Sequence, residues 1–587
     1  MFLGAAPWIP IRLLERYTIM SSKPVELVDR YVVDSLPLPC DQSPSTLPTL
    51  DFETQTCLER FPSERQSPAT VAMAGDLAVP SNAPVASFYS RVSAVRASAD
   101  AIPILVNGVY HLFHLTTPPN TRHHPPRLRS SWYRMRSKDL TRWTRDKGPS
   151  ISPGGVCSDP DADGAWTGAA VLGRDGRMNI FYTGYNLSEN GKQVILRTTS
   201  SSQNGDDFGC PGKQISILGE TRNILEDIDF RDPYVFWNDA ESTHWMIVAT
   251  RLKDGPYWSR GCIALLRSSN LEDWEMAPEP LYQPNDMFCP ECPEIFTLGN
   301  GKWYLVYSRF HAPDAGTVYR IADSPYGPFR IPRDGSHGRL DGRRWYAAKS
   351  CPEANDPSRR ISFGWIGDYV EKEQKWLWGG DLAVPREISA DEAGNLRMYP
   401  VAGALALFEA TSTRMPHPEN VELTALGSST FEVVKGLPAA QDVLIKFSVQ
   451  TMDAHSFGLV FHMDGTMKGF QLRFTKICGR YTVTLLTDFP PLDDFWADQY
   501  NLHLPRAVDG PELGRHEHVE LTEGILVVLK DRTLEAFFGG RALTYRLPEP
   551  PKKEGFRRLA YFVEDGSIRL TSFSIGAGGM TAQMGGS

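Results

Sequence analysis

The sequence predicts an all-β protein, built as a five-bladed β-propeller followed by a β-sandwich. Three observations lead to this prediction. The 49 glycines and 45 prolines favour turns over long helices, a strand-like unit recurs from about 91 to 395, and short strands follow one another closely after about 400. At 587 residues the chain is also too long for one ordinary core, so we expect at least two domains.

The recurring unit is a turn with glycine or a polar residue, followed by a strand rich in aromatic and β-branched residues. The units recur roughly every sixty residues, a period typical of propeller blades. Their strands are too continuously apolar for a single sheet with one face in water. Five units predict five blades; they are NGVYHLFHL at 107–115, DGRMNIFYTGY at 175–185, STHWMIVATR at 242–251, NGKWYLVYSRF at 300–310 and SRRISFGWI at 358–366.

A second pair of motifs supports the repeat. SKDLTRW at 137–143 follows the first unit and SSNLEDW at 268–274 follows the third. Each combines a polar turn with a tryptophan, and we expect that tryptophan to pack between blades. The alternative is that these are unrelated loops, each with a core tryptophan.

The organisation of the whole chain follows from these patterns. Residues 1–90 are rich in Pro and Ser and are interpreted as an extended lead-in. The propeller is expected over 91–400, a linker over 401–424 and the sandwich over 425–577, where strands such as QDVLIKFSVQT and FGLVFHMD are closely spaced. The last residues, 578–587, form a glycine-rich tail.

Composition excludes several classes of function. A net charge of −9 provides no basic field for nucleic acid or an anionic membrane, so we expect a neutral small molecule or oligosaccharide as the binding partner. Nine scattered cysteines argue against a disulfide scaffold. Cys289 and Cys292 form a C-x-x-C, but no second pair lies at zinc-binding spacing, so neither a metal nor a cofactor is expected. No signal peptide or membrane span is readable, which leaves a cytoplasmic location as the default expectation.

Acidic residues precede three of the five repeat turns at nearly the same phase. SADAIPIL contains Asp100, DFRDPYVF contains Asp232 and CPECPEIF contains Glu291. Inner strands of a propeller line its central channel, so these acids should converge. Hydrolysis of a glycosidic bond needs one carboxylate and one carboxylic acid in such a place. The alternative is that each acid caps a turn or pairs with a nearby arginine at a blade end.

The motifs around these acids resemble a known family. Residues from about 92 to 395 resemble the catalytic propeller of glycoside hydrolase family 32, the invertases, inulinases and levanases. Arg231-Asp232-Pro233 is similar to the family's RDP motif, and Glu291-Cys292 is similar to its EC motif. Further matches in the same order are YHLF at 110–113, Trp132 with SKDL, FYTGY at 181–185, YAAK at 346–349, GWIG at 364–367 and LAVPRE at 382–387.

The resemblance implies roles for individual residues. Asp100 would be the nucleophile, Glu291 the general acid/base and Asp232 a stabiliser that binds fructose hydroxyls. Arg231 would orient Asp232, and Cys292 would tune the environment of Glu291. The remaining candidates are pocket-lining and stacking residues: Trp166 and Thr167 would line the sugar pocket, and Trp132 and Trp345 would be stacking walls.

The first motif departs from the family. The nucleophile of the family lies in Trp-x-Asn-Asp-Pro-Asn-Gly, whereas this chain has Arg-Ala-Ser-Ala-Asp-Ala-Ile at 96–102. Only the aspartate is retained, and Leu115 replaces a glutamine of the family. Three alternatives therefore stay open: a hydrolase of arabinose- or xylose-containing polymers on the same scaffold, a non-catalytic carbohydrate-binding protein, and a transferase that forms fructo-oligosaccharides or difructose anhydrides.

Overall fold

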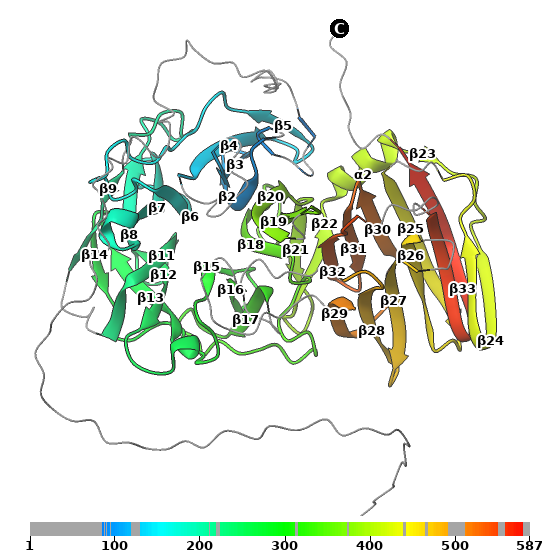
Figure 1. Cartoon of the computed structure of the whole chain (residues 1–587). Coiled ribbons are helices and arrows are strands. Elements are labelled where there is room, and N and C mark those ends of the chain that lie inside the picture. The colour runs from blue at the N-terminus through cyan, green and yellow to red at the C-terminus, as the bar shows by residue number, and fades with distance from the viewer. Residues whose placement is uncertain are drawn as a thin grey trace, which may run out of the picture. The chain divides into compact units, whose positions relative to one another are not determined.

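The computed structural model is built almost entirely of β-strands (Figure 1). It describes residues 85–578 apart from gaps at 87–88, 90, 94, 119–128, 210–211, 219–223, 311–314, 373–374, 438–441, 464–467, 491–510 and 550–557. Most of the predicted lead-in and tail therefore lie outside the described residues. Within the described part, no helix is both long and apolar enough to cross a membrane.

Residues 85–400 form antiparallel groups of strands that follow one another along the chain. The first group contains β2 (Ser98–Val106), β3 (Val109–Thr116), β4 (Ser131–Ser137) and β5 (Arg142–Arg145), with β1 (Val85–Ala86) at its edge. The second contains β6 (Gly164–Leu172), β7 (Met178–Asn186), β8 (Lys192–Thr199) and β9 (Lys213–Gln214). The third contains β11 (Leu225–Asn238), β12 (Thr243–Leu252), β13 (Gly261–Ser268) and β14 (Asp273–Met276), with β10 (Ser216–Leu218) parallel to β14.

Two further groups complete this part of the chain. The fourth contains β15 (Glu291–Thr297), β16 (Trp303–Arg309) and β17 (Gly316–Ala322), and the fifth contains β18 (Trp345–Pro352), β19 (Arg360–Val370), β20 (Lys375–Leu382), β21 (Arg386–Ala390) and β22 (Leu396–Pro400). The repeat units that the sequence revealed are the second strands β3, β7, β12, β16 and β19. The strands just upstream of them, which carry the acids, come first in each group.

The first strands of the groups contact one another in a closed cycle. β2 contacts β6, β6 contacts β11, β11 contacts β15, β15 contacts β18, and β18 contacts β2. A pairing between Ser98 of β2 and Gly380 of β20 joins the first and last groups into one sheet. This cyclic order is that of a β-propeller, in which closure removes most exposed strand edges.

The two tryptophan motifs behave alike, as predicted. In each, a serine hydroxyl accepts the N–H of a leucine with positive φ: Ser137 from Leu140 and Ser268 from Leu271. The turn then directs the tryptophan of the outer strand into a neighbouring group. Trp143 of β5 packs edge-on against Phe363 of β19, and Trp274 of β14 packs edge-on against Phe181 of β7. Each tryptophan therefore packs between groups.

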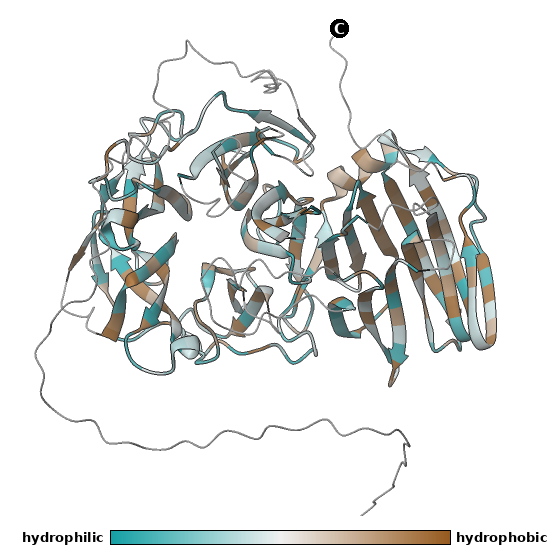
Figure 2. Ribbon diagram, viewed as in Figure 1, coloured by the Kyte–Doolittle hydropathy of each residue, from teal (hydrophilic) through white to brown (hydrophobic). Residues whose placement is uncertain are grey.

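The C-terminal part is a β-sandwich with one strand common to both layers. Its strands are β23 (Thr413–Arg414), β24 (Val421–Val433), β25 (Val443–Met452), β26 (Ser456–Met463), β27 (Phe470–Ile477), β28 (Arg480–Thr487), β29 (Glu512–Val519), β30 (Ile525–Lys530), β31 (Thr533–Phe538), β32 (Arg541–Arg546) and β33 (Arg558–Ala577). The first half of β33 pairs with β26 and the second half with β25. Where the partner of β33 changes from β26 to β25, Asp565 and Gly566 have positive φ. Figure 2 shows hydrophobic residues along the sandwich strands that form its core.

A buried ion cluster joins the last propeller strands to the sandwich. The guanidinium of Arg386 in β21 bonds to Asp341 and to Glu535 of β31, and all three side chains are fully buried. Thr544 of β32 accepts a further bond from Arg386, at 2.7 Å, and donates one to Asp341, at 2.6 Å. Paired in this way, the charges avoid the large cost of isolated burial.

Two local observations bear on the sequence predictions. The predicted linker at 401–424 contains helix α2 (Ala402–Thr411), strand β23 and the start of β24, which pair with β33. Cys157 is disulfide-bonded, which the scattered cysteines did not predict. Cys289 and Cys292 are both free thiols.

Candidate active site

The candidate site is built on a β-bulge that occurs in every first strand of the propeller. In each strand one extra residue interrupts the pairing with the second strand: Asp100 in β2, Thr167 in β6, and the segments that contain Asp232 in β11, Cys292 in β15 and Ala347 in β18. Asp232, Cys292 and Ala347 have positive φ. Proline follows Asp232 and Cys292 and is tolerated because a bulge needs no ladder N–H there. Bulges re-aim side chains, and here they bring residues of five strands together.

Asp232 is buried and held mainly by backbone and hydroxyl groups. One carboxylate oxygen accepts the N–H of Cys292 at 2.9 Å, and the Asp232 N–H donates to the hydroxyl of Thr183 at 2.8 Å. Arg231 lies 3.9 Å from the same carboxylate oxygen. Burial raises the pKa of Asp232 above its ordinary value, the charge of Arg231 opposes this shift, and the charge of Glu291 adds to it.

Glu291, at the start of β15, accepts one charged and one neutral hydrogen bond. The Nη2 of Arg231 donates to Oε1 at 3.1 Å, and the hydroxyl of Tyr346 donates to Oε2 at 2.6 Å. The residue is only 7% exposed. Both oxygens are therefore fixed before any substrate binds, by residues of the two adjacent propeller strands.

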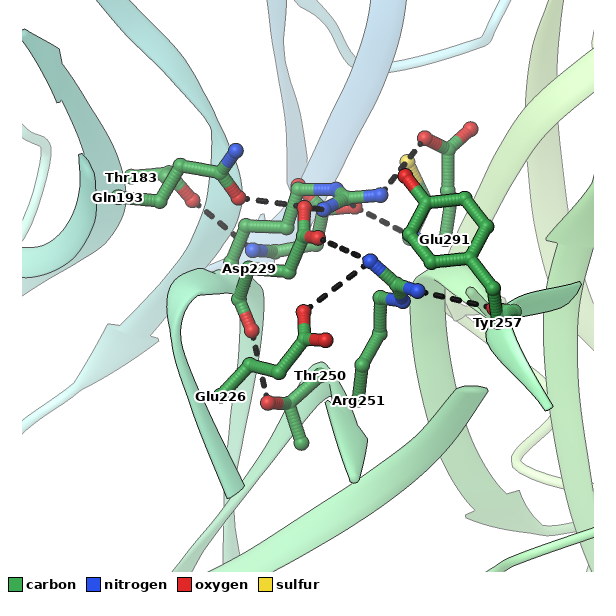
Figure 3. A network of polar contacts seen from close by, with 11 residues as sticks. Thr183, Gln193, Glu226, Asp229, Thr250, Arg251, Tyr257 and Glu291 are labelled. Atoms are coloured by element: carbon green, nitrogen blue, oxygen red, sulfur yellow. Dashed lines mark hydrogen bonds and ion pairs between the residues drawn. The ribbon is translucent and has the colours of Figure 1, made fainter. Parts of the chain in front are cut away.

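Arg231 is itself held by a second layer of polar residues, drawn in Figure 3. Its Nη1 donates to Asp229 at 2.6 Å and to Gln193 at 3.1 Å. The other oxygen of Asp229 accepts from Arg251 at 3.1 Å. Burial would raise the pKa of Asp229, but the charges of Arg231 and Arg251 hold it below its ordinary value. Asp229 thus supplies a fixed negative charge that orients the guanidinium of Arg231.

Asp100 projects from the bulge in β2 toward β15 and β19. The indole N–H of Trp365 donates to Oδ1 at 2.8 Å, and the thiol of Cys292 lies 3.9 Å from Oδ2. The pKa of Asp100 is raised to about 7, mainly by burial and in addition by the nearby carboxylates of Asp232 and Glu291, while the bond from Trp365 opposes the shift. The charges of Asp232 and Glu291 therefore influence the pKa of Asp100, in agreement with the convergence of the three acids that their position along the blades predicts.

Two other predicted pocket residues lie on β6, next to Asp232. Trp166 stacks on Tyr185 with ring centroids 4.0 Å apart and an interplanar angle of 17°. The carbonyl of Thr167 accepts the hydroxyl of Thr183, which is also the group that receives the Asp232 N–H. The bulge in β6 is in this way connected directly to the site.

The structure corrects the prediction that Trp132 and Trp345 are stacking walls. Trp132 has no exposed surface, and its indole N–H donates to the carbonyl of Trp166 at 3.0 Å. Trp345 is 1% exposed, and the guanidinium of Arg386 lies 4.4 Å from its ring centroid. Both rings fill the protein core and have no face left for a sugar. Phase along the strand had suggested a pocket position, but Trp132 reaches the backbone of the neighbouring group and Trp345 packs on Arg386 of its own group.

Sequence reasoning missed several residues of the site. Tyr346 and Trp365 lie in the family motifs YAAK and GWIG. The sequence predicts no role for either, because their partners are distant in sequence. Asp229 lies two residues before Arg231 and could have been recognised as a second acid in the same strand. Thr183 lies in FYTGY and gives no signal of its own.

Residues 101–400 match the family described as glycosyl hydrolases family 32, N-terminal domain. Among curated proteins, an insoluble isoenzyme of β-fructofuranosidase from Arabidopsis thaliana is 26% identical over 382 residues, which cover 60% of this chain and 61% of that relative. A sucrose-6-phosphate hydrolase from Zymomonas mobilis is 27% identical over 379 residues, covering 62% of this chain and 69% of that relative.

Solved structures share the fold at low sequence identity. Sucrose-6-phosphate hydrolase from Lactobacillus gasseri gives a TM-score of 0.61 at 17% identity, with 84% of this chain and 92% of that chain covered. Fructan 1-exohydrolase IIa from Cichorium intybus gives 0.60 at 18% identity, with 85% and 97% covered. These likenesses extend over both the propeller and the sandwich. The sequence match over more than half of the chain confirms the resemblance inferred from the motifs, and the chain belongs to glycosyl hydrolase family 32.

Proposed function

We propose that this chain hydrolyses fructose-containing sugars such as sucrose, fructo-oligosaccharides or fructans, with retention of configuration. The observation that carries the proposal is the convergence of Asp100, Asp232 and Glu291 from three propeller bulges. Arg231 lies 3.1 Å from Glu291 and 3.9 Å from Asp232, and Cys292 contacts Asp232 through its N–H and Asp100 through its thiol, which supports a common site for the three acids. Relatives named β-fructofuranosidase and sucrose-6-phosphate hydrolase supply the sugar class.

The chemistry follows a double displacement. A carboxylate oxygen of Asp100 attacks the anomeric carbon while Glu291 gives its proton to the departing glycosidic oxygen, so that a glycosyl-enzyme ester forms and the first product leaves. Glu291 then takes a proton from water, and the resulting nucleophile attacks the same carbon and releases Asp100. This scheme needs the two carboxyl groups roughly 5 Å apart. Asp232, fixed by the Cys292 N–H, is left to accept hydrogen bonds from sugar hydroxyls.

The environment of Asp100 suits a carboxylate that forms an ester with the sugar and is then freed by hydrolysis. Among the described residues its hydrogen-bond partners are neutral donors, and none of them forms an ion pair with it. The donor from Trp365 fixes which oxygen is free to attack. Arg231, by contrast, bonds to Glu291 and places its positive charge where a carboxylate forms when the proton is given away.

We further propose that the cyclic groups of strands are five blades and that the sandwich is a second domain, which follows the propeller near residue 400 as the sequence predicts. The sandwich begins before the predicted residue 425, because β23 and the start of β24 pair with β33. For the cellular location, we propose an oxidising compartment in place of the cytoplasm that the sequence led us to expect. Disulfides are typical of oxidising compartments, and Cys157 is disulfide-bonded. Thiol titration of the denatured chain before and after reduction would reveal the bond, and a chain without any disulfide would favour the cytoplasm.

A sugar panel tests the proposed activity. Purified wild-type chain and Glu291→Gln are incubated with sucrose, inulin, levan and an aryl arabinofuranoside, and the first-formed anomer is observed by NMR. The proposal expects fructose release with retention by the wild type alone. Cleavage of the arabinofuranoside only would favour the arabinose-polymer alternative. A chain that binds a fructoside, yet is as inert as Glu291→Gln on all substrates, would be a binding protein.

A further inference from the structure

An exposed tyrosine lies in the loop between β12 and β13. Tyr257 is the first residue of the short helix η3 (Tyr257–Ser259), and 49% of its surface is exposed. A single exposed aromatic residue is common on protein surfaces and means little by itself. Tyr257 differs from such a residue in two respects: it lies close to the candidate site, and several contacts hold its ring in place.

Strand register places this loop at the site end of the propeller. β12 runs antiparallel to β11, with Ala249 paired to Arg231, so the residues that end β12 lie beside the start of β11. On the other side of the loop, the N–H of Gly261 donates to the carbonyl of Met287 at 2.9 Å, four residues before Glu291. The loop therefore lies between the strand starts that carry Arg231 and Glu291.

The Tyr257 ring is held firmly although half of it faces solvent. The carbonyl of Tyr257 accepts from Arg251 at 2.9 Å, and the same guanidinium lies 4.4 Å from the Tyr257 ring centroid and 3.8 Å from that of Phe288. The ring also packs edge-on against Phe288 at 5.4 Å and against Trp258 at 4.9 Å. A ring that is already ordered loses little entropy when a ligand stacks on it.

The residue that holds Tyr257 also belongs to the network behind the acid/base. Arg251 donates to Asp229, Asp229 accepts from Arg231, and Arg231 donates to Glu291. Figure 3 shows the Tyr257 ring extending from the Arg251 end of this network toward Glu291. In the proposed reaction Glu291 protonates the departing oxygen, so the leaving group must lie on the Glu291 side of the scissile bond.

We propose that Tyr257, with Trp258 beside it, is a stacking platform for the leaving-group sugar. The inference rests on the proposed function and assigns to Tyr257 and Trp258 the recognition of the sugar ring that is attached to fructose. Sugar rings present an apolar C–H face that packs on an aromatic ring. A fructoside with a small alkyl leaving group has no such face and gains nothing from Tyr257.

Two substrates and two variants test this platform. kcat and KM are measured for sucrose and for methyl β-fructofuranoside with wild type, Tyr257→Ala and the matched control Tyr326→Ala. Tyr326 is likewise half exposed, but it packs against Trp245 near the start of β12, at the opposite end of that strand. We expect Tyr257→Ala to raise KM for sucrose about fivefold and to leave methyl β-fructofuranoside unchanged. Equal effects on both substrates, or none on sucrose, would overturn the platform.

Failure of the proposed function would be recognised separately. If the wild type cleaves neither fructoside, the hydrolase proposal fails, and calorimetric binding of the same two sugars then decides about the platform. The measurement uses Glu291→Gln with and without Tyr257→Ala. The platform is supported if adding Tyr257→Ala to Glu291→Gln weakens the binding of sucrose but not that of methyl β-fructofuranoside. Equal affinities in the two proteins, or no binding of either sugar, contradict it.

Discussion

Glu291 and Asp100 are held in the site by different kinds of partner. Glu291 accepts from the guanidinium of Arg231 as well as from the hydroxyl of Tyr346, whereas Asp100 accepts from the indole of Trp365 and lies near the thiol of Cys292. Within the described part of the chain, one carboxylate thus has a cation beside it and the other has neutral donors. Burial, together with the two neighbouring acids, raises the pKa of Asp100 to about 7. Ionisation of Asp100, the proposed nucleophile, therefore depends on the neutral groups around it.

Replacement of Asp100, the proposed nucleophile, should have the largest effect. Asp100→Asn keeps an acceptor for the Trp365 N–H but removes the attacking oxygen, so kcat for sucrose should fall about 10⁴-fold or more. The loss should hold for every substrate, whatever its leaving group. The control is Asp273→Asn, an exposed acid on the outer strand β14. Retention of more than about a tenth of the activity by Asp100→Asn would exclude Asp100 as the nucleophile.

Replacement of Glu291, the proposed acid/base, should have a large effect that depends on the leaving group. Glu291→Gln should lower kcat/KM for sucrose by about 10²–10⁴-fold, because the departing oxygen is no longer protonated. An aryl β-fructofuranoside, whose leaving group needs little protonation, should lose much less at the first step. A measurement of kcat/KM for both substrates compares the two carboxylates directly. The roles assigned here would be wrong if Asp100→Asn showed this leaving-group dependence and Glu291→Gln did not.

The pH profile should show that neutral donors hold the nucleophile. Attack needs ionised Asp100, so kcat/KM should fall as pH decreases below the pKa of Asp100. Trp365→Phe removes a donor that lowers this pKa, and the acid limb should therefore move upward by about 0.5–1 pH unit. The matched control is Trp245→Phe, which removes an indole N–H from Glu241 instead. An acid limb that stays in place in Trp365→Phe would contradict the assignment.

The smallest expected effect is on stability. Because the pKa of Asp100 is raised in the folded chain, the unfolded chain loses this proton first as pH rises from about 4. The resulting cost to folding increases up to about pH 7 and is then constant. Asp100→Asn carries no such cost and should have a Tm about 2–5 °C higher at pH 8, with no difference near pH 3. Thermal unfolding of both proteins at several pH values measures this, and an equal Tm at pH 8 would contradict it.

Much of the fold was accessible from the sequence because the repeat is local. Each second strand is marked by its own turn and apolar run, and the position of Trp143 and Trp274 follows from a polar turn a few residues away. Asp232 and Glu291 were found because the bulge beside each one also leaves a local motif with proline. The family followed from the same motifs.

What could not be predicted depends on contacts between distant strands. Trp365 reaches Asp100 across 265 positions in the sequence, and Tyr346 reaches Glu291 across 55. Trp132 and Trp345 were misplaced for a related reason. Period-two alternation indicates which face of a strand a residue occupies, but not whether that face meets a ligand or the next group of strands.

The buried cluster around Arg386 determines how the chain can be shortened or recombined. A fragment that ended at α2 would retain Arg386 and Asp341 but lose Glu535 and Thr544, leaving charged groups on a newly exposed apolar face. Such a fragment would be prone to aggregate rather than to persist as a free-standing catalyst. The sandwich is in this sense an obligatory cover, so genetic exchange of sandwiches between relatives would have to preserve these partners.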